Sequence, residues 1–218
     1  MKADTLNNID KVNISNRINN KHIIDKVFEP KLIQLLRNAD EGFRPTKKKR
    51  QDGSIYYTYK RNKFERSLTS KQIEKLISNP TSYEIYRNYI KTILTKLKSI
   101  GVIVVLNSKD MTERAGTWIP EKKIVELNYS SVKEGSKNFA RQLNHEVIHI
   151  VQYCKSGSIH ANPELIGLNT NISRQIAETL KSDIYKNMEQ QYFDLEVEAY
   201  SNQHNLRLGS KMLDIFCK

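Results

Sequence analysis

The feature that most constrains the fold is a run of apolar residues at helical spacing between Lys137 and Lys155. Its members are Phe139, Ala140, Leu143, Val147, Ile150, Val151 and Cys154. Residues three and four positions apart share one face of an α-helix, so this spacing predicts a half-buried helix. Ser136 is a suitable N-cap for the helix, and Gly157 is suited to the position just after its C-terminus.

Two histidines and a glutamate lie on this predicted helix, in the order His145-Glu146-Val147-Ile148-His149. Residues at positions i and i+4 lie on one helix face about one turn apart, so both imidazoles can reach one metal ion. Glu146 then points toward the open side of that ion. A chance match to this pattern should occur in roughly one such chain in a hundred. The spacing therefore predicts a metal site.

A catalytic zinc site needs a third protein ligand and keeps one position open for water. The side chains available downstream are His160, His204, Glu164, Glu178, Glu189, Glu196 and Glu198. Residues 192–202 predict a helix with acidic residues among apolar ones. Glu196 and Glu198 diverge by about 200° on such a helix, so we expect one to be a ligand and the other to be solvated.

The motif and the later glutamate resemble the gluzincin group of zincin metallopeptidases, in which HExxH is followed by a glutamate ligand on a later helix. The matching residues are His145, Glu146, His149 and Glu198. In that group a small residue commonly follows the ligand, as Ala199 follows Glu198, so the resemblance favours Glu198, with Glu196 as the alternative. It also implies one Zn²⁺ per chain. Asn202, four residues after Glu198, could accept the other ring N–H of a ligating histidine.

The chemistry that this resemblance implies is hydrolysis of a peptide or protein substrate. Bound Zn²⁺ lowers the pKa of its water to about 7 and polarises the substrate carbonyl, while Glu146 accepts the water proton and can pass it to the leaving nitrogen. The residue that steadies the oxyanion stays open among His204, Tyr200, Tyr153 and His160. We therefore expect a zinc-dependent metallopeptidase with Glu146 as its general base.

The residues before the motif predict elements in the order in which zincin cores place them. A capping-box pattern at 81–84 opens a helix that ends at Gly101, and 102–106 is a short strand buried on both faces. Residues 117–119 and 124–127 predict a hairpin. The expected fold is α+β and zincin-like. It has a small twisted antiparallel or mixed sheet packed on the active-site helix and on a later helix that carries the glutamate.

Zincins bind extended substrates as an added strand on a sheet edge just before the active-site helix, and the resemblance places that edge at residues 124–128. The backbone groups of Ile124, Val125, Glu126 and Leu127 would then supply most of the affinity for a peptide. A single sequence does not determine whether a strand lies at the edge of its sheet, so an internal position for this strand stays open.

The first 66 residues differ in character from the rest, which predicts a basic N-terminal extension at 1–66 and a metallopeptidase domain at 67–218. The clearest charge cluster is Lys47, Lys48, Lys49 and Arg50. Asp52-Gly53 is a hairpin-turn signal, and tyrosines are then interleaved with basic residues up to position 61. Such a segment can bind nucleic acid or an acidic partner. The rival hypothesis is therefore a nucleic-acid-binding or protein-binding regulator with an inert zincin-like domain.

Composition bounds the remaining possibilities. The 218 residues are 38% hydrophobic and 28% charged with a net charge of +12, which predicts a soluble globular domain with an extension. The longest wholly apolar run, 102–106, is too short for a membrane span, so we expect no membrane partner and a cytoplasmic location. The two cysteines are expected to be reduced, with Cys154 a small core residue.

Overall fold

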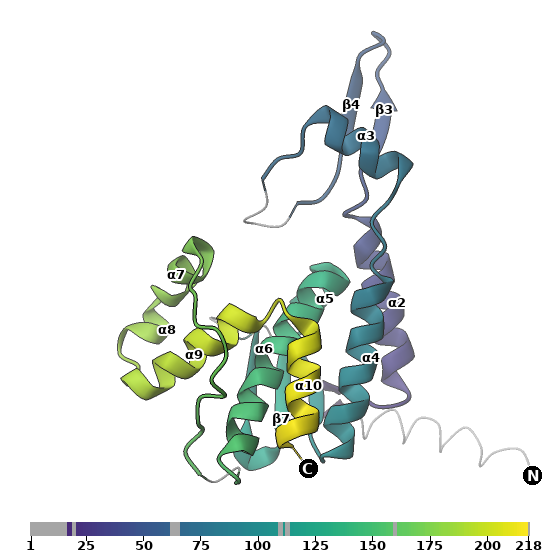
Figure 1. Cartoon of the computed structure of the whole chain (residues 1–218). Coiled ribbons are helices and arrows are strands. Elements are labelled where there is room, and N and C mark those ends of the chain that lie inside the picture. Colours follow the sequence, from purple (N-terminus) through teal and green to yellow (C-terminus); the bar gives the residue numbers. More distant parts are fainter. Residues whose placement is uncertain are drawn as a thin grey trace, which may run out of the picture.

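A computed structural model of the chain describes residues 17–18, 21–61, 66–108, 111, 114–158 and 161–217 (Figure 1). Its elements, in chain order, are β1 (Arg17–Ile18), β2 (Lys21–Ile23), α2 (Phe28–Glu41), β3 (Thr46–Lys49), β4 (Ile55–Thr58), α3 (Ser70–Ser78), α4 (Glu84–Ser99), β5 (Ile103–Asn107), β6 (Gly116–Ile119), η1 (Pro120–Lys122), β7 (Ile124–Asn128), α5 (Ser130–Lys133), α6 (Gly135–Lys155), α7 (Arg174–Leu180), α8 (Asp183–Lys186), α9 (Gln190–Asn202) and α10 (Leu206–Phe216). Among the described helices, none combines the length and the apolar character that a membrane span requires.

A mixed five-stranded sheet and a group of helices form the body of the molecule. The strand order is β1-β2-β5-β7-β6, with β5 and β7 parallel and the other neighbours antiparallel. α6 packs against β6 and β7, and α2, α4, α9 and α10 pack against α6. The α+β class is confirmed, and so is a mixed sheet beside the helix that carries the motif.

The strand expected to form a substrate-binding edge is internal. β7 lies between β5 and β6, where Val125 pairs with Val104 on one side and with Trp118 on the other. The prediction that Ile124, Val125, Glu126 and Leu127 form an edge is therefore wrong, because a distant strand, β5, covers that side of β7. The hairpin of β6 and β7 is confirmed. The sheet ends at β6 within the part of the chain that the structure describes.

The predicted amphipathic helix is confirmed as α6, and it lies at the centre of the body. Phe139, Leu143, Val147 and Val151 are fully buried on its apolar face. Removing each of these side chains from water contributes roughly 1.5–3 kcal/mol to folding. The face that carries the two histidines is largely buried as well, because α9 packs against α6. The helix is therefore held from several sides.

The N-terminus of α6 is capped by a residue of another helix. α6 begins at Gly135, so the N-cap role predicted for Ser136 is wrong. Ser136 instead donates its backbone N–H to Asp40 Oδ1 and its hydroxyl to Asp40 Oδ2, both at 2.7 Å. Arg87 forms an ion pair with the same buried carboxylate. Asp40 thus satisfies a free amide at the start of α6 and joins α2, α4 and α6.

The helix and strand predicted before the hairpin are both present. α4 ends just before Gly101, whose φ of +79° suits a glycine stop. The capping box predicted at 81–84 is wrong, because α4 begins at Glu84 and its N-cap Tyr83 makes no side-chain capping bond. The strand predicted at 102–106 is β5, one residue further along the chain.

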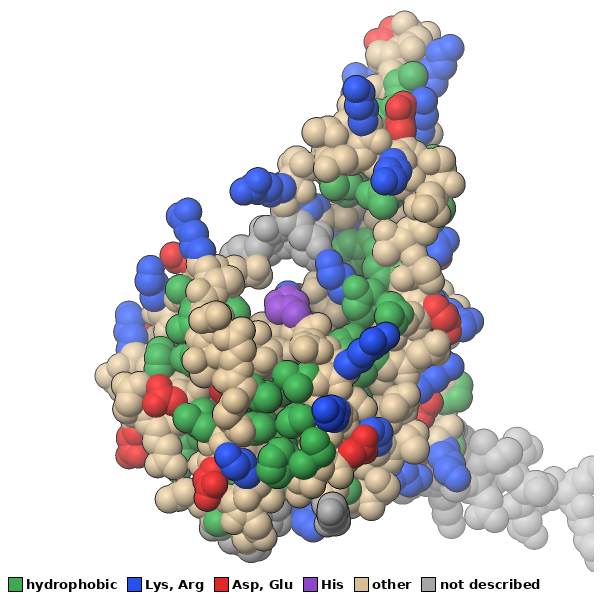
Figure 2. Space-filling model, in the orientation of Figure 1, with side chains coloured by type: hydrophobic (Ala, Val, Ile, Leu, Met, Phe, Trp, Pro, Cys, Tyr) green, Lys and Arg blue, Asp and Glu red, His purple; other side chains and the backbone are tan. Residues whose placement is uncertain are grey.

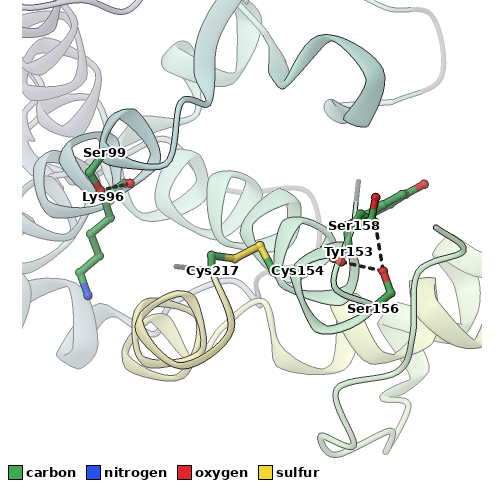
Figure 3. Close-up of a disulfide and its surroundings, with 7 residues drawn as sticks. All are labelled: Lys96, Ser99, Tyr153, Cys154, Ser156, Ser158 and Cys217. Carbon is green, nitrogen blue, oxygen red and sulfur yellow. Dashed lines mark hydrogen bonds between the residues drawn. A yellow bond between two sulfur atoms is a disulfide. The ribbon is translucent and has the colours of Figure 1, made fainter. Parts of the chain in front are cut away.

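The two cysteines form a disulfide, which corrects the expectation that both are reduced (Figure 3). Cys154, in the last turn of α6, is bonded to Cys217, directly after α10. The two Cα atoms lie 5.2 Å apart although the residues are separated by 63 positions in sequence. The pairing depends on α10 folding back along α6, which no local pattern reveals. The bond joins the C-terminal ends of the two helices.

The first part of the chain is divided between the body and a projecting arm. β2 pairs with β5, and α2 contributes Leu32, Ile33 and Leu36 to the core, so residues 21–41 belong to the body and not to an extension. Residues 42–80, here called the arm, leave the body between α2 and α4 as the hairpin β3–β4 and the helix α3 (Figure 1). The turn predicted at Asp52-Gly53 is confirmed.

α10 lies close against α6 at Gly209. A Cβ atom built on Gly209 would lie 2.0 Å from Asn144 Oδ1. Asn144 is fully buried, accepts a hydrogen bond from Tyr89 Oη at 2.5 Å, and donates to the carbonyl of Gln203 at 3.0 Å. It therefore cannot move aside without losing these bonds, so only glycine fits at this crossing.

We expect Gly209→Ala to lower the free energy of unfolding by about 1–3 kcal/mol, because an added methyl group overpacks the crossing of α10 and α6. Lys211→Ala is the control, since Lys211 is exposed two residues later and its removal should cost less than about 0.5 kcal/mol. Urea unfolding followed by circular dichroism measures both. Equal stability of the two variants would contradict the close approach.

Candidate metal centre

The two histidines of the motif meet one glutamate of α9. His145 Nε2 lies 3.1 Å from His149 Nε2, and Glu196 Oε2 lies 3.3 Å and 3.5 Å from those two atoms. Ligand atoms bonded to zinc at about 2.0–2.1 Å in a tetrahedron lie roughly 3.3 Å apart. The three side chains therefore have the donor atoms and the spacing to hold one metal ion.

Charge and burial at this cluster also favour a cation. Within the described part of the chain, Glu196 Oε2 is buried and makes no hydrogen bond, and His145 Nδ1 has none either. Burial alone would lower the pKa of His149, but Glu196, together with Glu146 and Gln152, outweighs it and raises that pKa to about 9. Burial would raise the pKa of Glu196, and the two imidazoles outweigh this and lower it. The carboxylate thus attracts positive charge to the position between the rings.

Glu198, the ligand favoured by the resemblance, points away from the histidines. Its carboxylate is fully buried and accepts the backbone N–H groups of Ile166, Gly167 and Leu168 at 2.8–2.9 Å. The preference for Glu198 is therefore reversed in favour of the alternative, Glu196. The divergence of the two residues on the helix is as predicted, but Glu198 is bonded to a loop and is not solvated.

A glutamine of α6 orients His149. Gln152 Nε2 donates to Leu195 O and to Glu198 Oε2, each at 3.0 Å, which turns Gln152 Oε1 toward His149 Nδ1 at 2.8 Å. Because Oε1 can only accept, Nδ1 keeps its hydrogen, and Nε2 is the nitrogen that would lose its proton and bind a metal.

The supporting role predicted for Asn202 is wrong. Its side chain donates to Asn169 O at 2.6 Å and Glu198 O at 2.8 Å, both away from the histidine rings. Gln152 makes the histidine contact instead. Sequence reasoning missed this residue although it lies three positions after His149, where a helix brings side chains together.

Glu146, the expected general base, lies beside the outer strand of the sheet. Its side chain is buried, and burial raises its pKa, while the charges of His145 and His149 oppose that rise. A Cβ atom built on Gly116 would lie 2.9 Å from Glu146 Oε1, so the backbone of β6 runs directly past the carboxylate. The Glu146 carboxylate therefore lies next to the last described strand of the sheet.

A cavity of about 510 Å³ opens over these residues. Its lining includes the cluster itself and a set of aromatic side chains, which are Trp118, Tyr153, Tyr185, Tyr192 and Tyr200. Arg114, Gly116 and Thr117 bring the start of β6 and the residues before it into the same wall. The cavity is thus bordered by the cluster, by Glu146 and by a strand edge.

Two tyrosines can donate hydrogen bonds next to the cluster. The Tyr200 ring centroid lies 4.4 Å from that of His145, and its hydroxyl lies 2.9 Å from the hydroxyl of Tyr185. Burial raises the pKa of both phenols, which keeps their O–H groups protonated. Among the other oxyanion candidates, Tyr153 lines the cavity, whereas His204 is exposed outside it. His160 lies outside the described residues.

Comparisons of the chain with protein-family models, with curated proteins and with solved structures find no match. The fold and the chemistry of the cluster are therefore the basis for any functional conclusion. The three side chains of this cluster, two imidazoles and one carboxylate, form a donor set that suits a divalent cation.

The choice between the two glutamates can be tested with isosteric variants. We expect Glu196→Gln to weaken zinc binding by more than about 100-fold, because it removes a direct ligand. Glu198→Gln should lower thermal stability, since it weakens the bonds to the loop at 166–168, and should reduce zinc affinity far less than Glu196→Gln, because it removes no ligand. Elemental analysis and chelator competition measure the zinc, and loss of zinc in Glu198→Gln alone would restore the original preference.

The contact between Gln152 and His149 can be tested by truncation. Gln152→Ala should weaken zinc affinity about 10–100-fold, because His149 loses the partner that fixes its tautomer. Gln142→Ala is the matched control, since Gln142 is on the same helix and in the same cavity but bonds to Glu134. Chelator competition on both folded variants gives the comparison. Equal affinities would show that Gln152 does not orient the ligand.

Proposed function

We propose that the protein is a zinc-dependent metallopeptidase of the gluzincin kind, with His145, His149 and Glu196 as the zinc ligands. The observation that carries the proposal is the convergence of these three donor atoms at tetrahedral spacing, beside a buried glutamate and a strand edge. A mixed sheet beside α6, and the packing of the glutamate-bearing α9 on the same helix, also support the proposal.

The donor set supports zinc among the divalent metals. Two imidazole nitrogens and one carboxylate oxygen are a common set for catalytic zinc, and three protein ligands leave a fourth position for water or substrate. A bound zinc ion would supply Lewis acidity and would lower the pKa of a bound water to about 7. The cavity in front of the cluster has room for that water and for a peptide.

Glu146 is the general base in this proposal. Burial raises its pKa, which makes the carboxylate a stronger proton acceptor than a solvated glutamate. In the proposed reaction it takes the proton from the attacking water and delivers it to the leaving nitrogen of the peptide. A glycine at position 116 lets the Glu146 carboxylate lie directly against β6, because a Cβ atom there would be 2.9 Å from Glu146 Oε1 and 2.7 Å from Leu127 Cδ2.

The free edge of β6 is the proposed substrate platform. Gly116, Thr117 and Trp118 line the cavity, and β6 is the last described strand on that side of the sheet. An extended peptide can pair with such an edge through its backbone. A backbone carbonyl of the peptide would then lie near Glu146, independently of the peptide's side chains. Tyr200 and Tyr185 line the same cavity, where their hydroxyls can stabilise the developing oxyanion.

We expect Glu146→Gln to lower peptide hydrolysis by about 10²–10⁴-fold, because the amide cannot accept the proton of the water. Zinc content should stay at about one per chain, since Glu146 is not a ligand. Glu189→Gln is the control, because Glu189 lines the same cavity but is exposed and away from the cluster. Cleavage of a mixed quenched-peptide library measures activity.

Three results of this experiment would count against the proposal. Full activity in Glu146→Gln would exclude this residue as the base. An equal loss in Glu189→Gln would point to a general electrostatic effect on the cavity. If the zinc-loaded native chain cleaves nothing in the library while it retains the metal, the metal site stands and the peptidase assignment falls.

A further inference from the structure

The arm carries most of the net charge of the protein. Residues 42–80 contain eleven of the 36 lysines and arginines but three of the 24 acidic residues, which gives the arm +8 of the total of +12. Figure 2 shows lysine and arginine side chains along this projection. A projection with such a charge attracts polyanions, because each neutralised phosphate releases counterions from nucleic acid.

One face of the β3–β4 ribbon contacts α3 through Glu74. Lys47 and Tyr57 are paired across the two strands, so their side chains lie on the same face. Tyr57 Oη donates to Glu74 Oε1 of α3 at 2.7 Å, and Lys47 Nζ lies 3.4 Å from the same oxygen. The charge of Lys47 is thus partly neutralised, and this face contacts the protein itself.

The opposite face of the ribbon is open. Lys48 is paired with Tyr56, and the guanidinium of Arg50 lies 5.1 Å from the Tyr56 ring. Lys48 and Arg50 are exposed, and the hydroxyls of Thr46 and Thr58 meet at 2.7 Å further along the same face. This open face combines two cations with one aromatic ring, and none of its paired residues is acidic.

A cavity of about 440 Å³ lies at the foot of the arm, where the chain continues from β4. Five cations line it, which are Arg44, Lys60, Arg61, Arg66 and Lys137. The acidic residues in its lining are Asp40 and Glu134, and Asp40 is already engaged by Arg87 and Ser136. Three tyrosines, Tyr59, Tyr83 and Tyr86, complete a lining of rings and positive charges.

We propose that the open ribbon face and this cavity bind single-stranded nucleic acid. The cations match a phosphate backbone, and the half-buried tyrosine rings beside them offer stacking positions for unpaired bases. An acidic protein would use the same cations but would have no need of Tyr56. The proposal is independent of the peptidase assignment, because neither surface includes a member of the metal cluster.

The test uses the full-length protein with fluorescein-labelled 20-mers of deoxythymidine and of uridine, and fluorescence anisotropy at several salt concentrations. We expect binding that weakens steeply as salt rises, with either 20-mer. A duplex of the same length should bind more weakly, because its bases cannot stack on a side chain. The two 20-mers separate a DNA from an RNA preference.

Two arm variants distinguish charge from stacking. Lys48→Ala combined with Arg50→Ala should reduce the slope of log affinity against log salt by about 1.4, which is roughly 0.7 for each lost phosphate contact to a single strand. Tyr56→Leu should weaken binding by about tenfold with the slope unchanged, because it removes a stacking ring and no charge. The matched control, Lys122→Ala combined with Lys211→Ala, removes two exposed charges from the body and should leave the slope as it is.

The outcomes that overturn the proposal are distinct. Absence of salt-dependent binding at about 50 mM salt, or an equal effect of the control pair and the arm pair, would exclude the arm as the site. Tighter binding of the duplex would exclude a single strand as the ligand. If heparin, a polyanion without bases, binds as tightly and Tyr56→Leu has no effect, the surface recognises acidic polymers or proteins in general.

Discussion

The arrangement of His145, His149 and Glu196 depends on a buried carboxylate outside this group. Glu198 binds three consecutive backbone amides of the loop at 166–168 and the side-chain amide of Gln152, so it joins that loop to α9 and α6. A buried carboxylate left without such partners is costly, so the rotation of α9 about its axis is strongly restrained. That rotation places Glu196, two residues earlier, against the histidines. The same restraint holds Gln152 in the orientation that selects the tautomer of His149.

Local spacing in the sequence was sufficient to predict the helix of the motif, the hairpin of β6 and β7, and the placement of His145 and His149 on one face. The choice of Glu196 over Glu198 was not predictable in the same way, because it depends on which face of α9 packs against α6. The internal position of β7 and the pairing of Cys154 with Cys217 were missed for a related reason. Each is decided by a partner from a distant part of the chain, and a single sequence records no such contact.

The composition of the first 66 residues was misleading about the domain boundary. The strongly basic stretch is an insertion, and the segment before it returns to the core as β2 and α2. Charge density marks the arm correctly, but it does not show where a polypeptide leaves a folded body and where it re-enters. Here it leaves after α2 and re-enters at α4, which are themselves in contact.

Asp40 caps α6 and so connects the base of the arm to the helix that carries His145 and His149. The arm departs at Gly42, two residues after Asp40, and the cavity at its foot is walled by Lys137 in the first turn of α6. His145 lies eight residues further along that helix, a distance of about 12 Å at the rise of an α-helix. A ligand bound in the cavity at the foot of the arm would therefore contact the same helix that carries His145 and His149.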